Sequence, residues 1–413
     1  MIEFDKEVLD NGLTVIVHKD AQASMVAVNT LYKVGARDES PDKTGFAHLF
    51  EHLMFGGSVH VPDFDTPLQR AGGQNNAFTN NDLTNYYVTI PKENLETALW
   101  LESDRMLNLA FSEKGLEVQR KVVIEEFRQR YLNQPYGDLW LELRPMAYKL
   151  HPYRWATIGK NIRHIERATM EDVKSFYQKY YNPSNAILSL AGNLEIPKIM
   201  DMVKKWYEEI PEGGSIKRAY PNEPFSNKGD VKFLERAVPQ NAIHLAWLMP
   251  DRKDETYHAH DLLSDVLSNG KSSRFYRKLV KEREIFTRLS AFITGSIDRG
   301  LFVISGMLSN DVEPDYAREA LLYELQSIAK DGVSQGELEK VRNKVVAQKA
   351  YQNSDNLNKA MNLAYHEFLD NAAEINTEKD KYLKVNREKI THVADNLLHN
   401  RGLFELQYHK TNG

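Results

Sequence analysis

Several common features are missing from this chain of 413 residues, and each absence excludes a class of protein or site. There is no cysteine, so disulfides and thiolate zinc ligands are impossible, and any zinc site must use histidine and carboxylate side chains. No apolar run approaches the roughly 18 residues that suggest a transmembrane helix, so we expect no membrane span. The net charge is −5 with no basic block, which argues against nucleic acid as a partner.

The amino terminus also lacks a feature, because Met1–Lys6 contains no hydrophobic core of a signal peptide. We therefore expect a cytoplasmic protein if Met1 is the native start, and a periplasmic or organellar protein if a leader has been removed. The remaining composition is ordinary for a globular protein, with 42% hydrophobic and 27% charged residues. The length suggests two or three domains.

One short motif stands out from this background: His48-Leu49-Phe50-Glu51-His52 reads H-x-x-E-H. On a helix, four residues advance by about 400°, so the two imidazoles lie within about 40° of each other on one face. Two such rings can hold one Zn²⁺, and Glu51 can reach a water at the metal without being a ligand. This order is the inverzincin signature of zinc hydrolases. A single histidine on a helix is more often packed or solvated, so the motif alone leaves both interpretations open.

The pattern of apolar residues and turn signals predicts alternating strands and helices, interrupted by a stretch rich in Gly, Pro, Ser and Asn at 211–229. We expect a zinc-bearing domain at 1–212, a linker at 213–229 and a second domain at 230–413. The order of elements is similar in the two halves, which indicates an internal duplication. The predicted strands cover 4–9, 13–18, 25–32, 85–90, 185–191, 240–248 and 302–307, and the predicted helices cover 43–55, 92–109, 113–134, 169–181, 196–209, 256–268 and 314–330.

The second half contains no H-x-x-E-H motif. Its predicted helix at 256–268 carries His258 and His260, which are two residues apart and so face different sides of a helix. We interpret them as ordinary surface or packing histidines, and the second half as a repeat without the metal site.

A catalytic zinc site uses three protein ligands and leaves one position for water, so the two histidines need a third ligand. The best candidates are Glu125 and Glu126, in the predicted helix at 113–134. Paired glutamates are usually a solvated helix face, so the residues alone do not choose between these two carboxylates or establish either as a ligand.

Four segments together resemble the pitrilysin and mitochondrial processing peptidase family, in its form with separate subunits. The segment 45–57 around the motif is similar to the family's metal helix, and 72–79 with Asp82, Thr84, Tyr86 and Tyr87 is similar to its substrate-binding edge strand. The segment 122–126 resembles the part that supplies the third ligand, and 181–185 resembles the turn before a late strand. The resemblance implies an α+β fold of two homologous α/β-sandwich domains, each a mostly antiparallel sheet covered by helices.

The resemblance also implies the roles of individual residues in a zinc endopeptidase. His48, His52 and Glu126, which lies 126 − 52 = 74 residues after His52, would hold one Zn²⁺ per chain, with Glu125 as the fallback ligand. Glu51 would be the general base. The segment Asn75, Asn76 and Ala77 would pair with an extended peptide, although a plain strand and turn is the alternative. Gln119, seven positions before Glu126, stands where relatives carry an acidic residue. A neutral glutamine can hydrogen-bond a ligating histidine but raises its basicity less, so zinc affinity is expected to be lower.

The chain departs from the family's pattern in its second half. Active members carry an Arg and a Tyr there, seven residues apart, and those positions fall on Val280 and Thr287. Neither side chain can replace its counterpart. The resemblance therefore implies a heterodimer with a homologous subunit that supplies Arg and Tyr, the two chains closing a chamber around a peptide or unfolded protein. Two alternatives remain: an active homodimer, and a non-catalytic scaffold or assembly subunit with a vestigial site.

Overall fold

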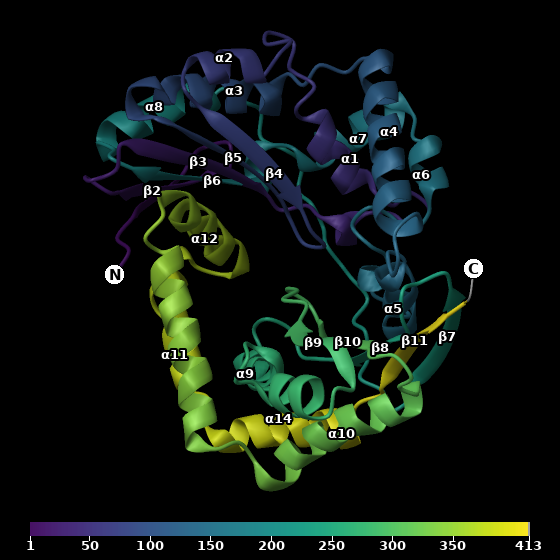
Figure 1. Ribbon diagram of the computed structural model, residues 1–413. Helices are drawn as coiled ribbons and strands as arrows, with labels where there is room; N and C mark the ends of the chain where they lie inside the picture. The colour runs from purple at the N-terminus through teal and green to yellow at the C-terminus, as the bar shows by residue number, and fades with distance from the viewer. Residues whose placement is uncertain (412–413) are drawn as a thin grey trace. The chain divides into compact units, whose positions relative to one another are not determined.

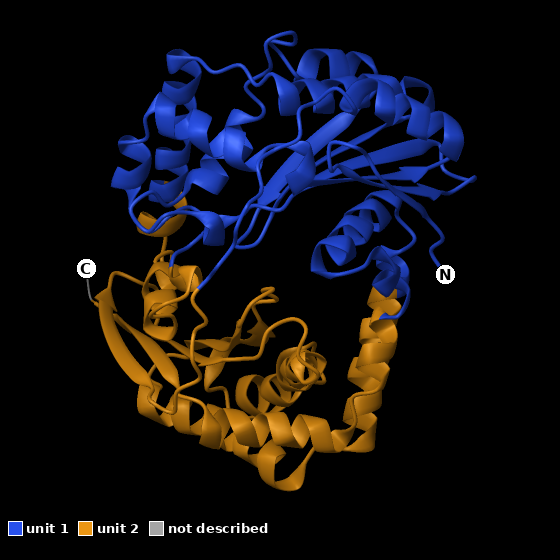
Figure 2. Cartoon of the chain, turned by 180° about the vertical axis from the view of Figure 1, so that it is seen from behind, with its two compact units in different colours: residues 1–128, 155–220, 350–377 blue, residues 129–154, 221–349, 378–413 orange. Residues whose placement is uncertain are grey.

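The computed structural model describes residues 1–411, which form two compact units. Unit 1 comprises residues 1–128, 155–220 and 350–377 (Figure 2). Unit 2 comprises residues 129–154, 221–349 and the chain from residue 378 onwards. Each unit is thus assembled from separate stretches of chain. The boundaries at 1–212, 213–229 and 230–413 follow the repeat in the sequence and stay a prediction.

Unit 1 is built on a six-stranded sheet in the order β1-β2-β6-β3-β5-β4 (Figure 1). β2 and β6 are parallel, and every other neighbouring pair is antiparallel. The strands are β1 (Asp5–Val8), β2 (Thr14–Lys19), β3 (Met25–Tyr32), β4 (Gln74–Thr79), β5 (Thr84–Pro91) and β6 (Ala186–Gly192). β6 is buried along its whole length, because helices cover both faces of the sheet.

Helices of unit 1 lie on both faces of this sheet (Figure 1). They are α1 (Phe46–Leu53), α2 (Asp65–Arg70), α3 (Leu95–Leu107), α4 (Glu113–Phe127), α6 (Ile162–Glu166), α7 (Met170–Tyr180), α8 (Ile196–Tyr207) and α12 (Asn356–Leu369). α3 packs on β3 and β5, whereas α12 packs on β3 and β6 from the other side. Small residues allow a close approach there, because Ala360 of α12 lies against Ala27 and Ala191. A segment from late in the chain therefore completes the first unit.

Unit 2 repeats this topology with five strands in the order β7-β11-β8-β10-β9. The last strand of each unit lies inside its sheet: β6 is parallel to β2 and antiparallel to β3, and β11 is parallel to β7 and antiparallel to β8. The strands are β7 (Asp230–Arg236), β8 (Ala242–Leu248), β9 (Phe286–Ile293), β10 (Leu301–Leu308) and β11 (Phe404–Lys410). The shared order confirms the predicted fold class of two α+β domains with mostly antiparallel sheets.

The helices of unit 2 again lie on both faces of the sheet. α5 (Leu139–Ala147) packs against β8 and β11, and α9 (Tyr257–Ser268) packs against β9. The other helices are α10 (Pro314–Asp331), α11 (Gln335–Gln352, which runs on into unit 1), α13 (Glu378–Leu383) and α14 (Arg387–Asn400). No helix within residues 1–411 is long and apolar enough to span a membrane.

One predicted helix is shorter than expected. The sequence predicts a single helix over 113–134, but α4 ends at Phe127 and the chain continues as a π-helical turn over Arg128–Leu132. The turn coincides with the passage of the chain from unit 1 to unit 2 after residue 128.

Candidate metal centre

Helix α1 carries the H-x-x-E-H motif and is anchored by its apolar face. Its buried residues are Phe46, Ala47, Leu49 and Phe50. The remaining positions leave His48, Glu51 and His52 partly exposed. The helix starts after Gly45, which has a φ of 90° and no room for a side chain, because a Cβ would lie 2.7 Å from the carbonyl oxygen of Ile158. The burial of one face therefore presents the three polar side chains on the other.

Helix α4 packs against α1 and brings Glu126 to the two histidines. The Glu126 Oε2 atom lies 3.5 Å from His48 Nε2 and 3.4 Å from His52 Nε2. One ligand atom from each residue can be chosen so that all three lie within 4.8 Å of one another. The structure thus brings together the three residues that the sequence analysis assigned as ligands.

The spacing of these three groups fits one zinc ion. Nitrogen and oxygen ligands bind Zn²⁺ at about 2.0–2.2 Å, so two ligands in a tetrahedral site lie about 3.4 Å apart. The two distances from His48 and His52 to the Glu126 oxygen, 3.5 and 3.4 Å, match this value. The side chains retain 13%, 26% and 18% exposure for His48, His52 and Glu126, so the cluster stays open to water and substrate. The donor set of two imidazoles and one carboxylate is that of a catalytic zinc site.

Glu125, the fallback ligand, lies elsewhere. Its side chain is 54% exposed and 3.8 Å from Arg128 in an ion pair on the helix surface. Consecutive helical residues are about 100° apart, so Glu125 and Glu126 cannot both face α1. Glu126 is the carboxylate that joins the histidines.

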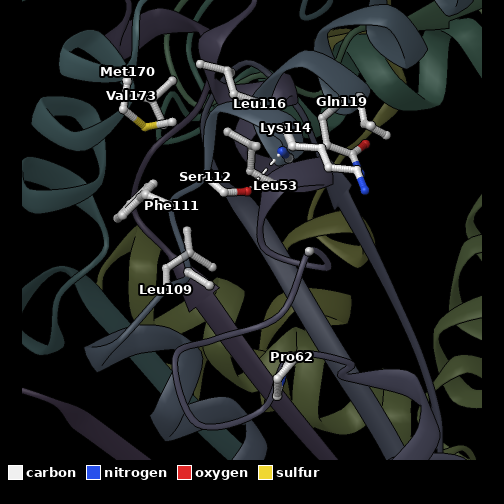
Figure 3. Close-up of a pocket in the computed structure, with 14 residues that line it drawn as sticks. Leu53, Pro62, Leu109, Phe111, Ser112, Lys114, Leu116, Gln119, Met170 and Val173 are labelled. Carbon is white, nitrogen blue, oxygen red and sulfur yellow. Dashed lines mark hydrogen bonds between the residues drawn. The ribbon is translucent and has the colours of Figure 1, made fainter.

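Gln119 lies seven residues before Glu126 on α4 and lines a pocket of about 460 Å³ beside Leu53 of α1 (Figure 3). Most of the other lining side chains are apolar, including Leu116 and Val173. The role of Gln119 as a hydrogen-bonding partner of a ligating histidine stays a prediction.

Glu51 is half-buried beside the cluster and is held by the end of strand β4. Burial raises the pKa of the Glu51 carboxyl above its ordinary value, and hydrogen bonds from the side chain and backbone of Thr79 oppose this rise. The neighbouring Glu126 carboxylate raises the same pKa, while His52 lowers it. A raised pKa suits a carboxylate that must accept and release a proton. Thr79 was not among the predicted site residues, although it lies in the segment 72–79 that carries the resemblance.

Strand β4 is the outer strand of its sheet and pairs with β5 alone within the described chain. Asn75, Asn76 and Ala77 lie in its middle, with exposure that alternates along the strand. The Asn75 side chain donates to Asp65 Oδ1 at 2.8 Å, and the Ala77 N–H donates to the Asn76 side-chain oxygen at 2.8 Å. One edge of β4 thus offers main-chain groups to a further strand, and their pairing with a substrate stays a prediction.

The corresponding helix of unit 2, α9, follows β8 as α1 follows β3, but its histidines are buried. His258 is 6% exposed and its Nε2 lies 3.2 Å from Glu378 Oε1. His260 is 3% exposed and its Nδ1 lies 2.9 Å from the carbonyl oxygen of Thr256. Both are packing histidines, and His48, His52 and Glu126 form the one metal-type group within residues 1–411.

The two positions that correspond to the family's Arg and Tyr also lie in unit 2. Val280 packs against the apolar core from the π-helical turn Tyr276–Glu282. Thr287 is exposed on β9 and accepts a hydrogen bond of 2.6 Å from Gln240. Neither residue offers a cationic or phenolic group.

Comparison with protein families gives matches over most of the chain. Residues 14–156 match the family described as insulinase (peptidase family M16), and residues 167–345 match the family described as the peptidase M16 inactive domain. A curated relative, the zinc protease PqqE of Helicobacter pylori, is 31% identical over 344 residues, which cover 81% of this chain and 76% of the relative. A probable beta subunit of the mitochondrial-processing peptidase of Arabidopsis thaliana is 25% identical, over 82% of this chain and 65% of the relative.

Solved structures show the same fold. The crystal structure of a protease from Helicobacter pylori aligns with a TM-score of 0.92 and 26% identity, covering 99% of this chain and 100% of that one. Pitrilysin aligns with a TM-score of 0.78 and 17% identity, and the match covers 98% of this chain but 45% of pitrilysin. The latter identity supports the fold alone.

Proposed function

Because the chain belongs to the M16 family of peptidases, we propose that it is the zinc-bearing subunit of an endopeptidase that hydrolyses extended peptides inside a closed chamber. The observation that carries this proposal is the convergence of His48, His52 and Glu126 at the spacing of zinc ligands, with Glu51 beside them. The zinc proteases among the relatives support the choice of metal.

Each residue of the cluster has a defined task in this proposal. His48, His52 and Glu126 would hold the ion, which when bound would supply positive charge to activate water and polarise the peptide carbonyl. Glu51 accepts a proton from the attacking water and delivers it to the leaving amine. Thr79 holds the Glu51 carboxyl beside the ion-binding cluster through its hydrogen bonds.

The substrate in this proposal is an extended peptide that adds a strand to the edge of β4. Asn75, Asn76 and Ala77 would make the contact. The Asn76 side chain accepts the Ala77 N–H, so it must move aside before a peptide carbonyl can take this donor. Main-chain pairing favours unfolded over folded protein as substrate, because a folded chain already pairs its own backbone.

A partner subunit is the second part of the proposal. Val280 and Thr287 lack the chemistry of the Arg and Tyr that active relatives use, so a homologous chain would supply those two side chains. The Arabidopsis relative, itself a beta subunit of a processing peptidase, is consistent with a divided enzyme. The alternatives are an active homodimer, and a scaffold that kept a vestigial site.

One experiment separates these possibilities. The chain is purified alone and together with a homologous subunit that carries Arg and Tyr, and zinc content and cleavage of unfolded peptides are measured for both samples. The proposal expects one zinc per chain in each sample but strong turnover in the mixed sample alone. Full turnover by the isolated chain would establish the homodimer, and a zinc-loaded complex without turnover would favour the scaffold.

A further inference from the structure

We propose that Glu39 is a positioning residue that fixes the metal-bearing helix α1 against the β4–β5 hairpin. The inference rests on the proposed function, because it concerns the geometry of the same zinc site. It assigns to Glu39 a task that neither the H-x-x-E-H motif nor the ligand set includes.

Glu39 caps the amino-terminal end of α1 from outside the helix. Its Oε2 atom accepts the Gly45 N–H and its Oε1 atom accepts the Ala47 N–H, both at 2.9 Å. The first backbone N–H groups of a helix have no partner within the helix, and Gly45 at the N-cap has no side chain to provide one. The carboxyl group of Glu39, six residues before the cap, therefore replaces an N-cap side chain, and one of its two donors, Ala47, directly precedes the ligand His48.

The segment that carries Glu39 is fixed at its other end to the turn between β4 and β5. The Ala36 N–H donates to the Asn80 carbonyl at 3.1 Å, and the Arg37 N–H donates to the Asn81 carbonyl at 2.9 Å. The contact is tight, because a Cβ on Gly35 would lie 2.6 Å from the backbone of this turn. Residues 35–39 thus connect the hairpin to the start of α1.

A second connection between the same two elements lies near the other end of α1. Thr79, the last residue of β4, hydrogen-bonds the carboxyl of Glu51 on α1. Edge strand, connecting segment and helix therefore form a closed ring of contacts. Such a ring fixes where the ligands His48 and His52 lie relative to the strand, and Glu39 is the member that holds the helix start.

The environment of Glu39 makes this contact hard to replace. The side chain is 6% exposed. Burial raises the pKa of Glu39 to about 8, while the hydrogen bonds from Ala47 and Gly45 oppose the rise. Loss of the acceptor would leave two N–H groups of the helix start without a partner away from water, which is unfavourable.

The equivalent helix of unit 2 is capped locally instead. The Asp254 Oδ1 atom accepts the Thr256 N–H at 2.8 Å and the Thr256 hydroxyl at 2.6 Å, just before α9 begins at Tyr257. This cap ties α9 to its own preceding turn and to no strand. The cap from a segment that also contacts the β4–β5 turn belongs to the helix that carries the metal motif.

The test measures zinc affinity of the full chain carrying Glu39→Gln, by competition with a chromophoric chelator well below the unfolding temperature. The amide can accept at one oxygen only and turns an NH₂ group towards the other N–H, so the helix start should shift. We expect zinc affinity to fall by about tenfold, the scale seen when groups that orient ligands are removed. In the assembled enzyme, kcat should fall while KM for the peptide changes little.

Glu223→Gln is the matched control. Glu223 is also buried, at 4% exposure, and its Oε2 atom accepts three backbone N–H groups, from Lys149, Leu150 and His151. It lies in unit 2, so its loss should lower the melting temperature without changing zinc affinity. If Glu39→Gln does not fold, Glu39→Asp keeps a carboxyl group with two acceptor oxygens at a shorter reach, and a smaller loss of zinc affinity is expected.

The outcomes separate this inference from the proposed function. A folded Glu39→Gln or Glu39→Asp chain with wild-type zinc affinity and kcat would overturn the positioning role and leave a simple structural cap. A wild-type chain that binds no zinc would instead remove the proposed function. A loss of zinc affinity in the Glu39 variants but not in Glu223→Gln would establish the inference.

Discussion

Unit 1 and unit 2 have the same order of five strands, yet they use the helix after the second of those strands differently. In unit 1, α1 leaves His48, Glu51 and His52 partly exposed, and α4 brings Glu126 to them. In unit 2, α9 is covered, and its buried residues include both histidines. The shared strand order therefore does not by itself produce a metal site. The difference lies in which face of one helix is left uncovered, and in whether a carboxylate from a second helix reaches that face.

The polar groups of α9 show how a buried histidine and a carboxylate interact without a metal ligand set. His258 lies against Glu378, whose carboxylate also binds Arg252 in a buried cluster. The hydrogen bond from His258 and the charge of Arg252 outweigh the effect of burial and keep the pKa of Glu378 well below its usual range. Histidine and carboxylate therefore occur together in both units, but in unit 2 an arginine neutralises the carboxylate. An arginine at that position leaves no role for a metal ion.

The largest effect should come from Glu51→Gln, which removes the proposed base and keeps the ligands. Turnover of an unfolded peptide by the assembled enzyme should fall by about a thousandfold, because general acid–base catalysis contributes 10²–10⁴-fold. Zinc content, measured by elemental analysis, should stay at one per chain. Glu125→Gln, which alters an exposed carboxylate on α4, is the control and should keep wild-type turnover. Equal turnover in the two variants would eliminate Glu51 as the base.

The next prediction contrasts one histidine from each unit. His48→Ala removes a ligand and should weaken zinc binding by more than about a hundredfold, the largest effect typical of outer-shell partners. His258→Ala should leave zinc binding unchanged and lower the free energy of unfolding by about 2 kcal/mol, because Glu378 loses a buried hydrogen bond. Chelator competition and denaturant unfolding measure the two effects. Weaker zinc binding by His258→Ala would contradict the conclusion that only the histidines of unit 1 bind zinc.

The sequence predicted the local parts of this site well. The i, i+4 spacing of His48 and His52 defines one helix face wherever the helix lies, and the predicted helix at 43–55 contains α1. Glu126 followed from family resemblance and not from spacing, since Glu125 is chemically identical and only the packing of α4 separates them. Thr79 was missed because its partner Glu51 lies on another element, and Glu39 because it stands six and eight residues before its donors, outside the usual N-cap positions. The same reason hides the packing of α12 on the sheet of unit 1.

A pH experiment sharpens the contrast between exposed and buried histidines. Burial lowers the pKa of His260 from 6.5 to about 4. As the pH falls below 6.5, His260 becomes protonated in the unfolded chain but stays neutral in the folded chain until about pH 4. The free energy of unfolding therefore decreases between pH 6.5 and pH 4. His260 lowers the free energy of unfolding by at most about 3 kcal/mol, because each pKa unit corresponds to about 1.36 kcal/mol. Thermal unfolding of unit 2 followed at several pH values measures it.

His260→Gln should flatten this dependence, because glutamine does not titrate. The control is His399→Gln on α14, whose side chain is 62% exposed and should not alter the slope. Since the carbonyl of Thr256 can only accept, Nδ1 of His260 carries the proton in the neutral ring, and the glutamine NH₂ can take its place. An unchanged slope in His260→Gln would show that other groups set the acid sensitivity.

The smallest effect on turnover should come from Thr79→Val at the end of the edge strand β4, where the two units also differ. β4 ends on Thr79, which hydrogen-bonds Glu51, whereas the corresponding strand β9 ends on the apolar Ile293. Thr79→Val imitates the apolar end of unit 2 with little change of volume, and Thr79→Ser keeps the hydroxyl as the control. A lost hydrogen bond of about 1 kcal/mol corresponds to about a fivefold fall in kcat, with KM and zinc content unchanged. If Thr79→Val and Thr79→Ser turn over peptide equally, the backbone N–H of residue 79 holds Glu51 without the side chain. The distinction between β4 and β9 would then lie in main-chain geometry and not in the threonine.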